Sequence, residues 1–213
     1  MRREKCVTAP GVRHGTRRVS RRRVNEDRRT SRAPTYYALF YDGDFLPYAR
    51  ERSPAADRPI YVGKAVPAGS RKGQQTGAEP RSTRLFGRLA EHARTIDTAT
   101  NLNLPDFLCR YLVVTPLWIT MAERFLIENF QPIWNVCIDG FGPHDPGSGR
   151  HQGRIPWWHA LHPGRPWALK LRQTRSQDDA LKRLAECYER QAADPEAALR
   201  HAEQVADAEV ERD

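Results

Sequence analysis

The sequence predicts an α+β fold: a small antiparallel three-stranded sheet flanked by helices, with an inserted loop and a helical C-terminal extension. Three observations predict it. Two short aromatic runs have the length of strands, a continuous apolar run follows a segment of helical periodicity, and a second helical segment stops at a proline. The 213 residues, of which 39% are hydrophobic, suffice for one domain with extensions.

The first two strands are expected to form a hairpin with a long connection. Residues 35–41 are an aromatic run that ends at the turn Asp42-Gly43, and residues 59–64 are a second short run. Several prolines lie in the loop between them. Residues 66–82 are rich in Gly, Ser, Gln and Arg, which predicts an exposed insertion.

Two helices and a third strand follow. Residues 83–96 have helical spacing, because at 100° per residue three apolar side chains fall within about 40° of one another: Leu85, Leu89 and Ile96. Residues 107–114 are continuously apolar, which predicts a central strand. Residues 119–130 form a second helix that ends before Pro132.

The C-terminal part combines a loop-rich segment with helices. Residues 139–167 are rich in Gly and Pro but carry three tryptophans, which indicates packing rather than a linker. Residues 176–190 are predicted to be helical. The sequence Asp194-Pro195 is a start signal for a further, terminal helix.

Charge divides the chain into three parts. Of the net charge of +9, residues 1–35 carry +9 and residues 177–213 carry −6. We interpret 1–33 as a basic, flexible arm, 34–175 as the folded domain and 176–213 as an acidic helical tail. A basic chain favours a polyanionic partner, most simply nucleic acid. The alternatives are an arginine excess that reflects a GC-rich genome, and an arm that is a dispensable extension.

Several classes of protein are disfavoured. No run of 18 apolar residues spans a membrane, and the N-terminus has no apolar secretory run, so we expect a soluble cytoplasmic protein with no membrane partner. Four separated cysteines without a CxxC pair argue against a disulfide framework and a cysteine zinc site, which fits a reducing cytosol. Irregular spacing argues against a zinc site built from the histidines His144, His151, His159 and His162. A Walker A loop is absent.

Three polar side chains fall on the apolar faces of the two central helices. Glu123 lies inside the face formed by Ile119, Leu126 and Phe130, and His92, four residues after Arg88, lies beside Leu85. A buried carboxylate is costly unless it is paired or binds a metal. Each residue has a structural alternative: an ion pair for Glu123, a hydrogen-bonded core position for His92 and a position at the rim for Arg88.

Together these side chains suit phosphodiester hydrolysis. A guanidinium can clamp a phosphate, an imidazole can carry a proton near neutral pH, and a carboxylate is a hard ligand for Mg²⁺. The strands add two tyrosines, Tyr37 and Tyr61, which taken alone would be interpreted as core residues. Asn135 taken alone would be a helix-end residue.

The motifs on these elements resemble the GIY-YIG nuclease superfamily. Residues 35–37, Thr-Tyr-Tyr, stand where that family has its first motif, with Thr in place of the usual Gly, and residues 61–63, Tyr-Val-Gly, stand for the second. Arg88, His92 and Glu123 continue the match, and Asn135 follows Glu123 by twelve residues, as in the family.

The flanking segments are similar to one branch of this superfamily. The insertion after Lys64, His92 one turn after Arg88, and the run 139–147 look like its type II restriction endonucleases, most of all the branch that cuts CCGCGG. The resemblance covers about residues 34–170. It implies a GIY-YIG fold and Mg²⁺-dependent, site-specific hydrolysis of double-stranded DNA that leaves 5′-phosphate and 3′-hydroxyl ends, with Mn²⁺ able to substitute.

The resemblance also implies roles for single residues. Glu123 would hold the metal, Arg88 would clamp the scissile phosphate, and Tyr37 would be the base that activates water, with its pKa lowered or its proton relayed to His92. Tyr61 would position the water or the phosphate. Lys64 would contact a phosphate or help to lower the tyrosine pKa, and Asn135 would fix local backbone or a phosphate.

The resemblance implies a prokaryotic protein whose partners are double-stranded DNA, a second copy of the chain and a cognate cytosine methyltransferase. A palindromic site matches a homodimer in which each subunit cuts one strand. Arginine suits a G·C site, since it pairs with guanine through two hydrogen bonds. Candidate DNA-binding residues lie in the two insertions, 66–82 and 139–167: Arg71, Lys72, Arg81, Arg150, Arg154 and Arg165. The alternatives are a structure-specific or mobile-element nuclease of this superfamily and a non-catalytic DNA-binding protein.

Overall fold

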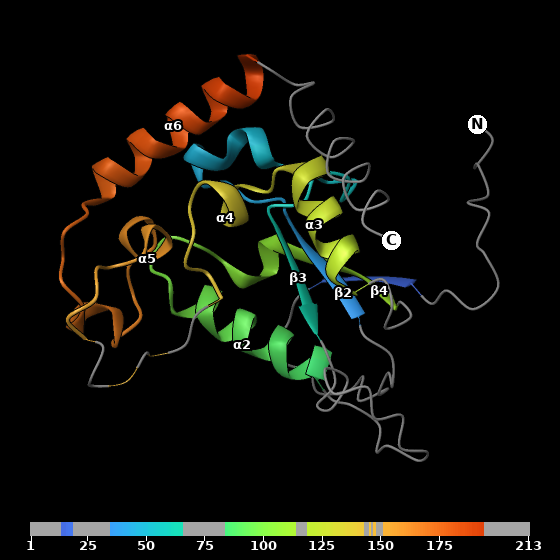
Figure 1. The fold of residues 1–213 in the computed structure, drawn as a ribbon, viewed down its shortest axis with the longest axis horizontal. Helices are drawn as coiled ribbons and strands as arrows, with labels where there is room; N and C mark the ends of the chain where they lie inside the picture. Colours follow the sequence, from blue (N-terminus) through green and yellow to red (C-terminus); the bar gives the residue numbers. More distant parts are fainter. Residues whose placement is uncertain are drawn as a thin grey trace, which may run out of the picture.

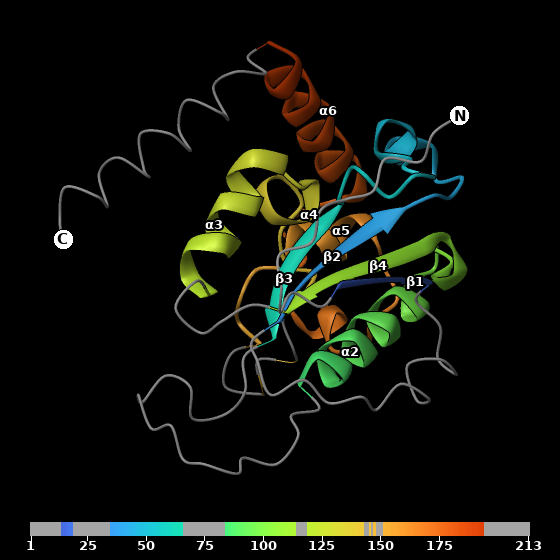
Figure 2. The same ribbon diagram turned by 90° about the vertical axis from the view of Figure 1, so that its right-hand side faces the viewer.

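The protein is built around an antiparallel four-stranded sheet with helices on both sides (Figures 1 and 2). This computed structural model describes residues 14–18, 35–65, 84–113, 119–142, 145, 147 and 151–193. Its elements are, in order, β1 His14–Arg18, β2 Thr35–Tyr41, η1 Leu46–Glu51, β3 Tyr61–Ala65, α2 Arg84–Thr98, η3 Leu104–Asp106, β4 Phe107–Val113, α3 Ile119–Phe130, α4 Ile133–Val136, α5 Trp157–Leu161, η6 Ala168–Lys170 and α6 Gln177–Ala193.

The three predicted strands lie next to one another in this sheet. The order is β1-β4-β2-β3, and every pairing is antiparallel. β2 therefore has a partner on each side, and β4 is central as predicted. β3 lies at an edge of the sheet.

A fourth strand extends the predicted three-stranded sheet, and it lies within the segment that we interpreted as a basic arm. His14–Arg18 pairs with β4 over its whole length, from His14 opposite Leu112 to Arg18 opposite Leu108. The sequence HGTRR has no apolar alternation, so no strand was predicted there. Its pairing uses backbone hydrogen bonds, which any side chain permits. The rest of segment 1–33 lies outside the described residues.

The core lies mainly on one face of the sheet. Alternate residues of β2, such as Tyr37 and Leu39, pack there against α2, α4 and α5 in a cluster rich in aromatic rings. Tyr48 is fully buried within it, where its hydroxyl accepts a hydrogen bond from Trp134 Nε1 at 2.8 Å and lies 2.5 Å from His162 Nε2. In both ribbon views the sheet runs between α2 and α3, and α3 packs beside β3 (Figures 1 and 2).

Helix α3 has the predicted bounds but is less buried than the sequence suggested. Phe130, which the helical wheel placed on the buried face, is 42% exposed, and Phe125 is 56% exposed. A wheel gives the direction of each side chain but not what covers it. Because α3 lies at the edge of the sheet, Glu123 lies at a partly open position and not deep in a core.

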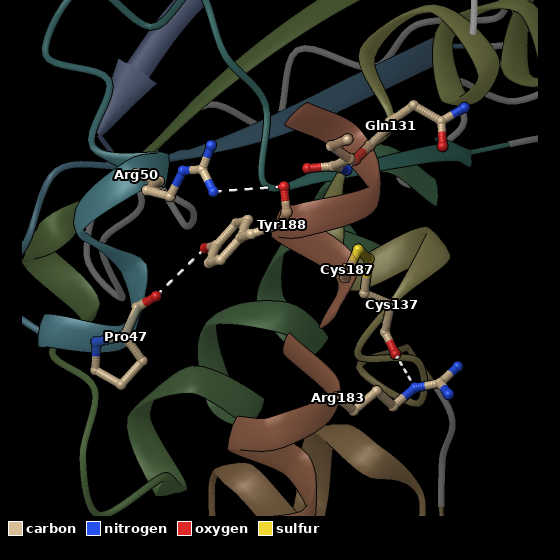
Figure 3. The surroundings of a disulfide bond; sticks show 8 residues. Pro47, Arg50, Gln131, Cys137, Arg183, Cys187 and Tyr188 are labelled. Atoms are coloured by element: carbon tan, nitrogen blue, oxygen red, sulfur yellow. Dashed lines mark hydrogen bonds between the residues drawn. A yellow bond between two sulfur atoms is a disulfide. The ribbon is translucent and has the colours of Figure 1, made fainter. Parts of the chain in front are cut away.

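Helix α6 confirms the helix predicted over 176–190 and extends it to Ala193. The residues of the further predicted helix lie outside the described part. A disulfide between Cys137 and Cys187 joins α6 to the end of α4, and Arg183 Nε donates a hydrogen bond to the Cys137 carbonyl at 2.6 Å (Figure 3). The sequence argued only against a disulfide framework, and this single pair was not foreseen because the fold brings together two cysteines that are 50 residues apart.

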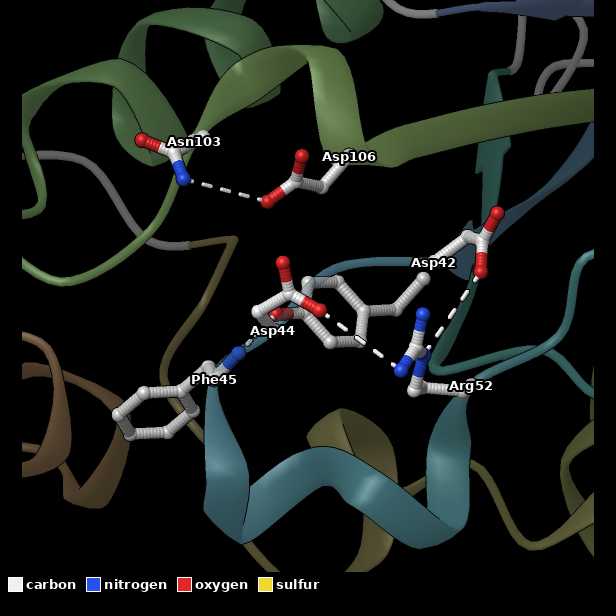
Figure 4. A network of polar contacts seen from close by, with 7 residues as sticks. Asp42, Asp44, Phe45, Arg52, Asn103 and Asp106 are labelled. Carbon is white, nitrogen blue, oxygen red and sulfur yellow. Dashed lines mark hydrogen bonds and ion pairs between the residues drawn. The ribbon is translucent and has the colours of Figure 1, made fainter.

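Polar contacts surround the end of β2 and the start of β4, including the ion pairs of Arg52 with Asp42 and Asp44 (Figure 4). The Asp42 N–H donates to the Asp106 carbonyl at 2.8 Å, and the Phe45 N–H donates to the Tyr41 hydroxyl at 2.8 Å. A Cβ at Gly43 would overlap the Asp106 carboxylate and the Tyr41 hydroxyl, so this turn requires glycine. The network holds the register of β2 and thereby the position of Tyr37.

Among the described residues, no helix is long and apolar enough to cross a membrane.

Candidate active site

Tyr37 and Tyr61 lie on the same face of the sheet. Tyr37 is opposite Gly63 in the pairing of β2 with β3, and Tyr61 is opposite Leu39. Their ring centroids are 6.2 Å apart. A Cβ at Gly63 would come within 2.6 Å of the Tyr37 hydroxyl, so the small residue of the second motif makes room for the tyrosine of the first.

His92 brings α2 into contact with Tyr37. Its ring is 1% exposed, and its Nε2 lies 2.7 Å from the Tyr37 hydroxyl. The ring stacks on Phe141 with centroids 4.5 Å apart and planes 15° apart. This packing holds the imidazole in one orientation, in direct hydrogen-bonding contact with the tyrosine.

Burial raises the pKa of Tyr37 above its ordinary value. The neighbouring Tyr61 adds to this effect, and the Arg88 guanidinium opposes it without outweighing it. Burial raises the pKa of Tyr61 in the same way. A lowered tyrosine pKa, one of the two routes considered from sequence, is therefore not what this environment produces. The relay to His92 is the route for which a hydrogen bond exists.

Arg88 lies next to both tyrosines. Its guanidinium lowers the pKa of each against the larger effect of burial. Its Nη1 donates to Glu91 Oε2 at 3.0 Å, and both side chains are 31% exposed. A Cβ at Gly142 would be 3.5 Å from Arg88 Nη2 and 3.4 Å from the Tyr61 hydroxyl, so the segment after α4 closes over this group.

Glu123 lies beside the other face of β3. Its carboxylate forms an ion pair with the Lys64 ammonium, and the two side chains are 25% and 30% exposed. Tyr36 is opposite Lys64 in the strand pairing, and burial, with the Glu123 charge second, raises its pKa to about 12. Lys64 thus contacts Glu123, where the sequence analysis expected a phosphate contact or an effect on Tyr37. Its place in β3 puts it on the face opposite to Tyr37.

Tyr61 connects these two groups of residues. The charges of Arg88 and of Glu123 both act on its pKa, in opposite directions. Because β3 is an edge strand, groups on its two faces can approach the same point beyond the edge. One side contributes Tyr37, His92 and Arg88, and the other contributes Glu123.

Asn135 holds the outer edge of β3. Its Oδ1 accepts from the Val62 N–H at 2.8 Å, and its Nδ2 donates to the Val62 carbonyl at 2.9 Å. The Trp134 N–H donates to the Ile60 carbonyl at 3.0 Å. The Asn135 side chain on helix α4 therefore continues the hydrogen bonding of the sheet. Of the two roles considered for Asn135, fixing local backbone or contacting a phosphate, these hydrogen bonds correspond to the first.

Two residues near the site were not predicted. Phe141 packs on both His92 and Tyr61, with ring centroids 4.5 and 5.0 Å away, and Glu91 pairs with Arg88. Phe141 lies in the run 139–147 that was noted from sequence, but an aromatic residue there gave no signal of its own. Glu91 was detectable from its spacing of three residues after Arg88.

The DNA-binding candidates are only partly described. Arg154 is exposed, and Arg165 is half-buried with its guanidinium 5.3 Å from the centre of the Trp167 ring. The other four candidates lie outside the described residues: Arg71, Lys72, Arg81 and Arg150. Within the described part of the chain, no three His, Cys, Asp or Glu side chains are grouped as for a metal ion.

Comparison with known families identifies this arrangement. The family model of the Eco29kI GIY-YIG domain matches residues 30–188. The chain belongs to this family. It is therefore a DNA endonuclease of the restriction type with a GIY-YIG fold, as the sequence motifs had predicted. No curated protein matches the chain. The Eco29kI match contains every candidate catalytic residue and extends beyond the predicted domain end at residue 175 into α6.

Proposed function

We propose that this GIY-YIG nuclease is a type II restriction endonuclease that requires Mg²⁺ and cuts double-stranded DNA at a short GC-rich palindrome, CCGCGG, leaving 5′-phosphate and 3′-hydroxyl ends. The observation that carries the proposal is the hydrogen bond between Tyr37 and His92, with Arg88 beside it and Glu123 on the other side of an edge strand. Such a set can activate water, hold a phosphate and bind a metal.

The residues present fit a single Mg²⁺. Glu123 offers a hard carboxylate oxygen at a partly exposed position, and a cation, the Lys64 ammonium, already lies against it. Mg²⁺ keeps several of its waters and is commonly bound through one or two carboxylates and substrate phosphates, so one glutamate is a sufficient protein ligand. When bound, the ion would supply positive charge to the leaving 3′-oxygen.

The proton path follows from the Tyr37 environment. An isolated tyrosinate is costly in this buried place, because burial raises the tyrosine pKa. The Tyr37 hydroxyl can pass its proton to His92 Nε2, 2.7 Å away, as it takes one from the attacking water. The new bond joins the water oxygen to phosphorus, the bond to the 3′-oxygen breaks, and the proton rests on His92. Arg88 stabilises the charge that develops on the phosphate.

The proposal includes a homodimer and a protected host. A palindrome presents the same half-site to two subunits related by a two-fold axis, so each active site would cut one strand. A cytosine methyltransferase would protect the host DNA. Arg154 and Arg165 are the described candidates for contacts to this DNA.

A digestion experiment tests the proposal. The purified protein is incubated with phage DNA of known sequence in Mg²⁺, in Mn²⁺ and in EDTA. Discrete fragments with either metal and none in EDTA are expected, and sequencing their ends gives the site and the cut. A smear or single nicks would instead indicate a structure-specific or mobile-element nuclease, and intact DNA that still shifts in a binding gel would indicate a non-catalytic protein.

A variant pair tests the metal site. Glu123→Ala should bind the site but not cut it, because the proposed metal ligand is gone. Glu128→Ala is the matched control on the same helix, since that carboxylate pairs with Arg124 and not with Lys64. Cleavage by Glu123→Ala at a rate near wild type in Mg²⁺ would refute the metal assignment.

A further inference from the structure

The Arg88 side chain reaches two places with the two arms of its guanidinium. One arm, Nη1, donates to Glu91 Oε2 at 3.0 Å. The other arm, Nη2, lies toward the site, because a Cβ at Gly142 would be 3.5 Å from this nitrogen, 3.4 Å from the Tyr61 hydroxyl and 4.0 Å from His92 Cε1. Three groups of the site therefore converge on one point, and Arg88 reaches it with the arm that does not bind Glu91.

Helix α2 itself places Glu91 for this contact. Glu91 follows Arg88 by three residues, which puts it about 60° to one side around the helix, and His92 follows by four, about 40° to the other side. The guanidinium thus has a carboxylate on one side and an imidazole on the other. Because a guanidinium is planar and its donors form a rigid fork, an ion pair at one arm also fixes the direction of the second arm.

The ion pair is partly open to solvent, so its contribution is to geometry more than to stability. The Arg88 and Glu91 side chains are each 31% exposed, and pairs at such positions contribute little to the free energy of unfolding. Glu91 also acts on a second cation. Burial lowers the pKa of Arg165 and nearby Arg94 adds to this effect, while the Glu91 carboxylate opposes it. Glu91 therefore lies near two guanidiniums.

We propose that Glu91 is a positioning residue for cleavage: its carboxylate holds Nη1 of Arg88, so that Nη2 points at the scissile phosphate. The role rests on the proposed function, in which Arg88 clamps that phosphate. Without the carboxylate the guanidinium would still attract a phosphate through its charge, but from several rotamers. A displacement of about 1 Å from the reactive geometry can cost a factor of about 10² in rate. Glu91 thus contributes to the rate of cleavage and not to the affinity for DNA.

Glu91→Gln tests this role, since glutamine keeps the size of the side chain and removes its charge. Single-turnover cleavage is measured in Mg²⁺, and the dissociation constant for the same duplex is measured in EDTA. We expect the rate to fall about 10- to 100-fold. Binding should be unchanged or up to about fivefold tighter, because a negative charge near the phosphate is lost. Glu186→Gln is the matched control, the same substitution at an exposed position of α6, and should behave as the wild type does.

NMR of the arginine guanidiniums tests the same contact without DNA. In protein labelled with ¹⁵N-arginine, the Arg88 signals are assigned by their loss in Arg88→Lys. A guanidinium held at one arm rotates slowly and should give separate Nη1 and Nη2 signals in the wild type and in Glu186→Gln. Glu91→Gln should merge them into one averaged signal. An averaged signal in the wild type, or separate signals that survive in Glu91→Gln, would overturn the proposal.

The outcomes distinguish this role from the proposed function. If the wild type cuts no DNA, the proposed function fails, while the NMR signals still report whether Glu91 holds Arg88. If the wild type cuts and Glu91→Gln loses rate and affinity by the same factor, the proposed function stands and the positioning role is refuted. A Glu91→Gln protein that cuts faster than the wild type would also refute it, because Glu91 would then only compete with the phosphate for Arg88.

Discussion

Asn135→Ala separates the two roles that the sequence left open for this residue. In the structure its side chain makes two hydrogen bonds to Val62, of 2.8 and 2.9 Å, at the outer edge of β3. A typical hydrogen bond contributes about 0.5–1.5 kcal/mol net, so the loss of both should cost about 2 kcal/mol. For a protein of this size, 1 kcal/mol shifts the unfolding midpoint by about 2–4 °C. We therefore expect the midpoint to fall by about 4–8 °C.

The same variant should also lose activity. Val62 lies between Tyr61 and Lys64, so a loosened edge displaces groups on both faces of β3. Thermal unfolding and single-turnover cleavage of a cognate duplex are the assays. Asn103→Ala is the matched control, because Asn103 is exposed and its contact to Asp106 is long, at 3.4 Å. An unchanged midpoint for Asn135→Ala, together with weaker DNA binding, would refute the backbone role and support a phosphate contact.

Three further predictions concern single residues. Tyr37→Phe should lower the single-turnover rate by a factor of about 10²–10⁴, the usual contribution of a general base. Tyr111→Phe is the control, because Tyr111 lies opposite Tyr37 in β4, and it should leave the rate unchanged. A change within about twofold for Tyr37→Phe would contradict the proposed proton path. Lys64→Gln should tighten Mn²⁺ binding about two- to fivefold, measured by calorimetry without DNA. The reason is that the Lys64 ammonium competes with the metal for Glu123, and a partly exposed ion pair contributes up to about 1 kcal/mol. Weaker Mn²⁺ binding would refute this competition between Lys64 and the metal. Burial lowers the pKa of His162 to about 3, below the value of about 6.5 in the unfolded chain, so the unfolded state takes up the proton first and stability should fall as the pH drops from 6.5 toward 3. His162→Gln should flatten this dependence of the unfolding midpoint and His151→Gln, at a partly exposed site, should not; equal slopes for both would show that His162 is not responsible.

The arrangement around β3 explains why the candidate site needs an edge strand. Tyr37, His92 and Arg88 pack on one face, while Lys64 and Glu123 meet on the other. In the middle of a sheet, neighbouring strands would separate such groups. At an edge only one side is paired with a strand, and here Asn135 satisfies the outward-facing backbone groups of Val62.

The sequence by itself determined the elements and the chemistry. The bounds of β2 and α3 agree with the prediction, because apolar runs and helical periodicity are local properties that survive folding. Arg88 and His92 share a helix face for the same reason. Local motifs were also sufficient to identify the family.

Only the tertiary structure decided which of these groups meet. The pairing of Lys64 with Glu123, the stacking of Phe141 on His92 and the bond between Cys137 and Cys187 each join residues distant in sequence. Strand β1 likewise pairs with β4, from which it is distant in sequence. The degree of burial has the same origin. Tyr37 is buried, which raises its pKa, whereas Phe130 stays exposed, and both outcomes depend on what the rest of the chain packs around these side chains. Periodicity gives a side chain its direction, but the neighbours that set its energy are brought there by the fold.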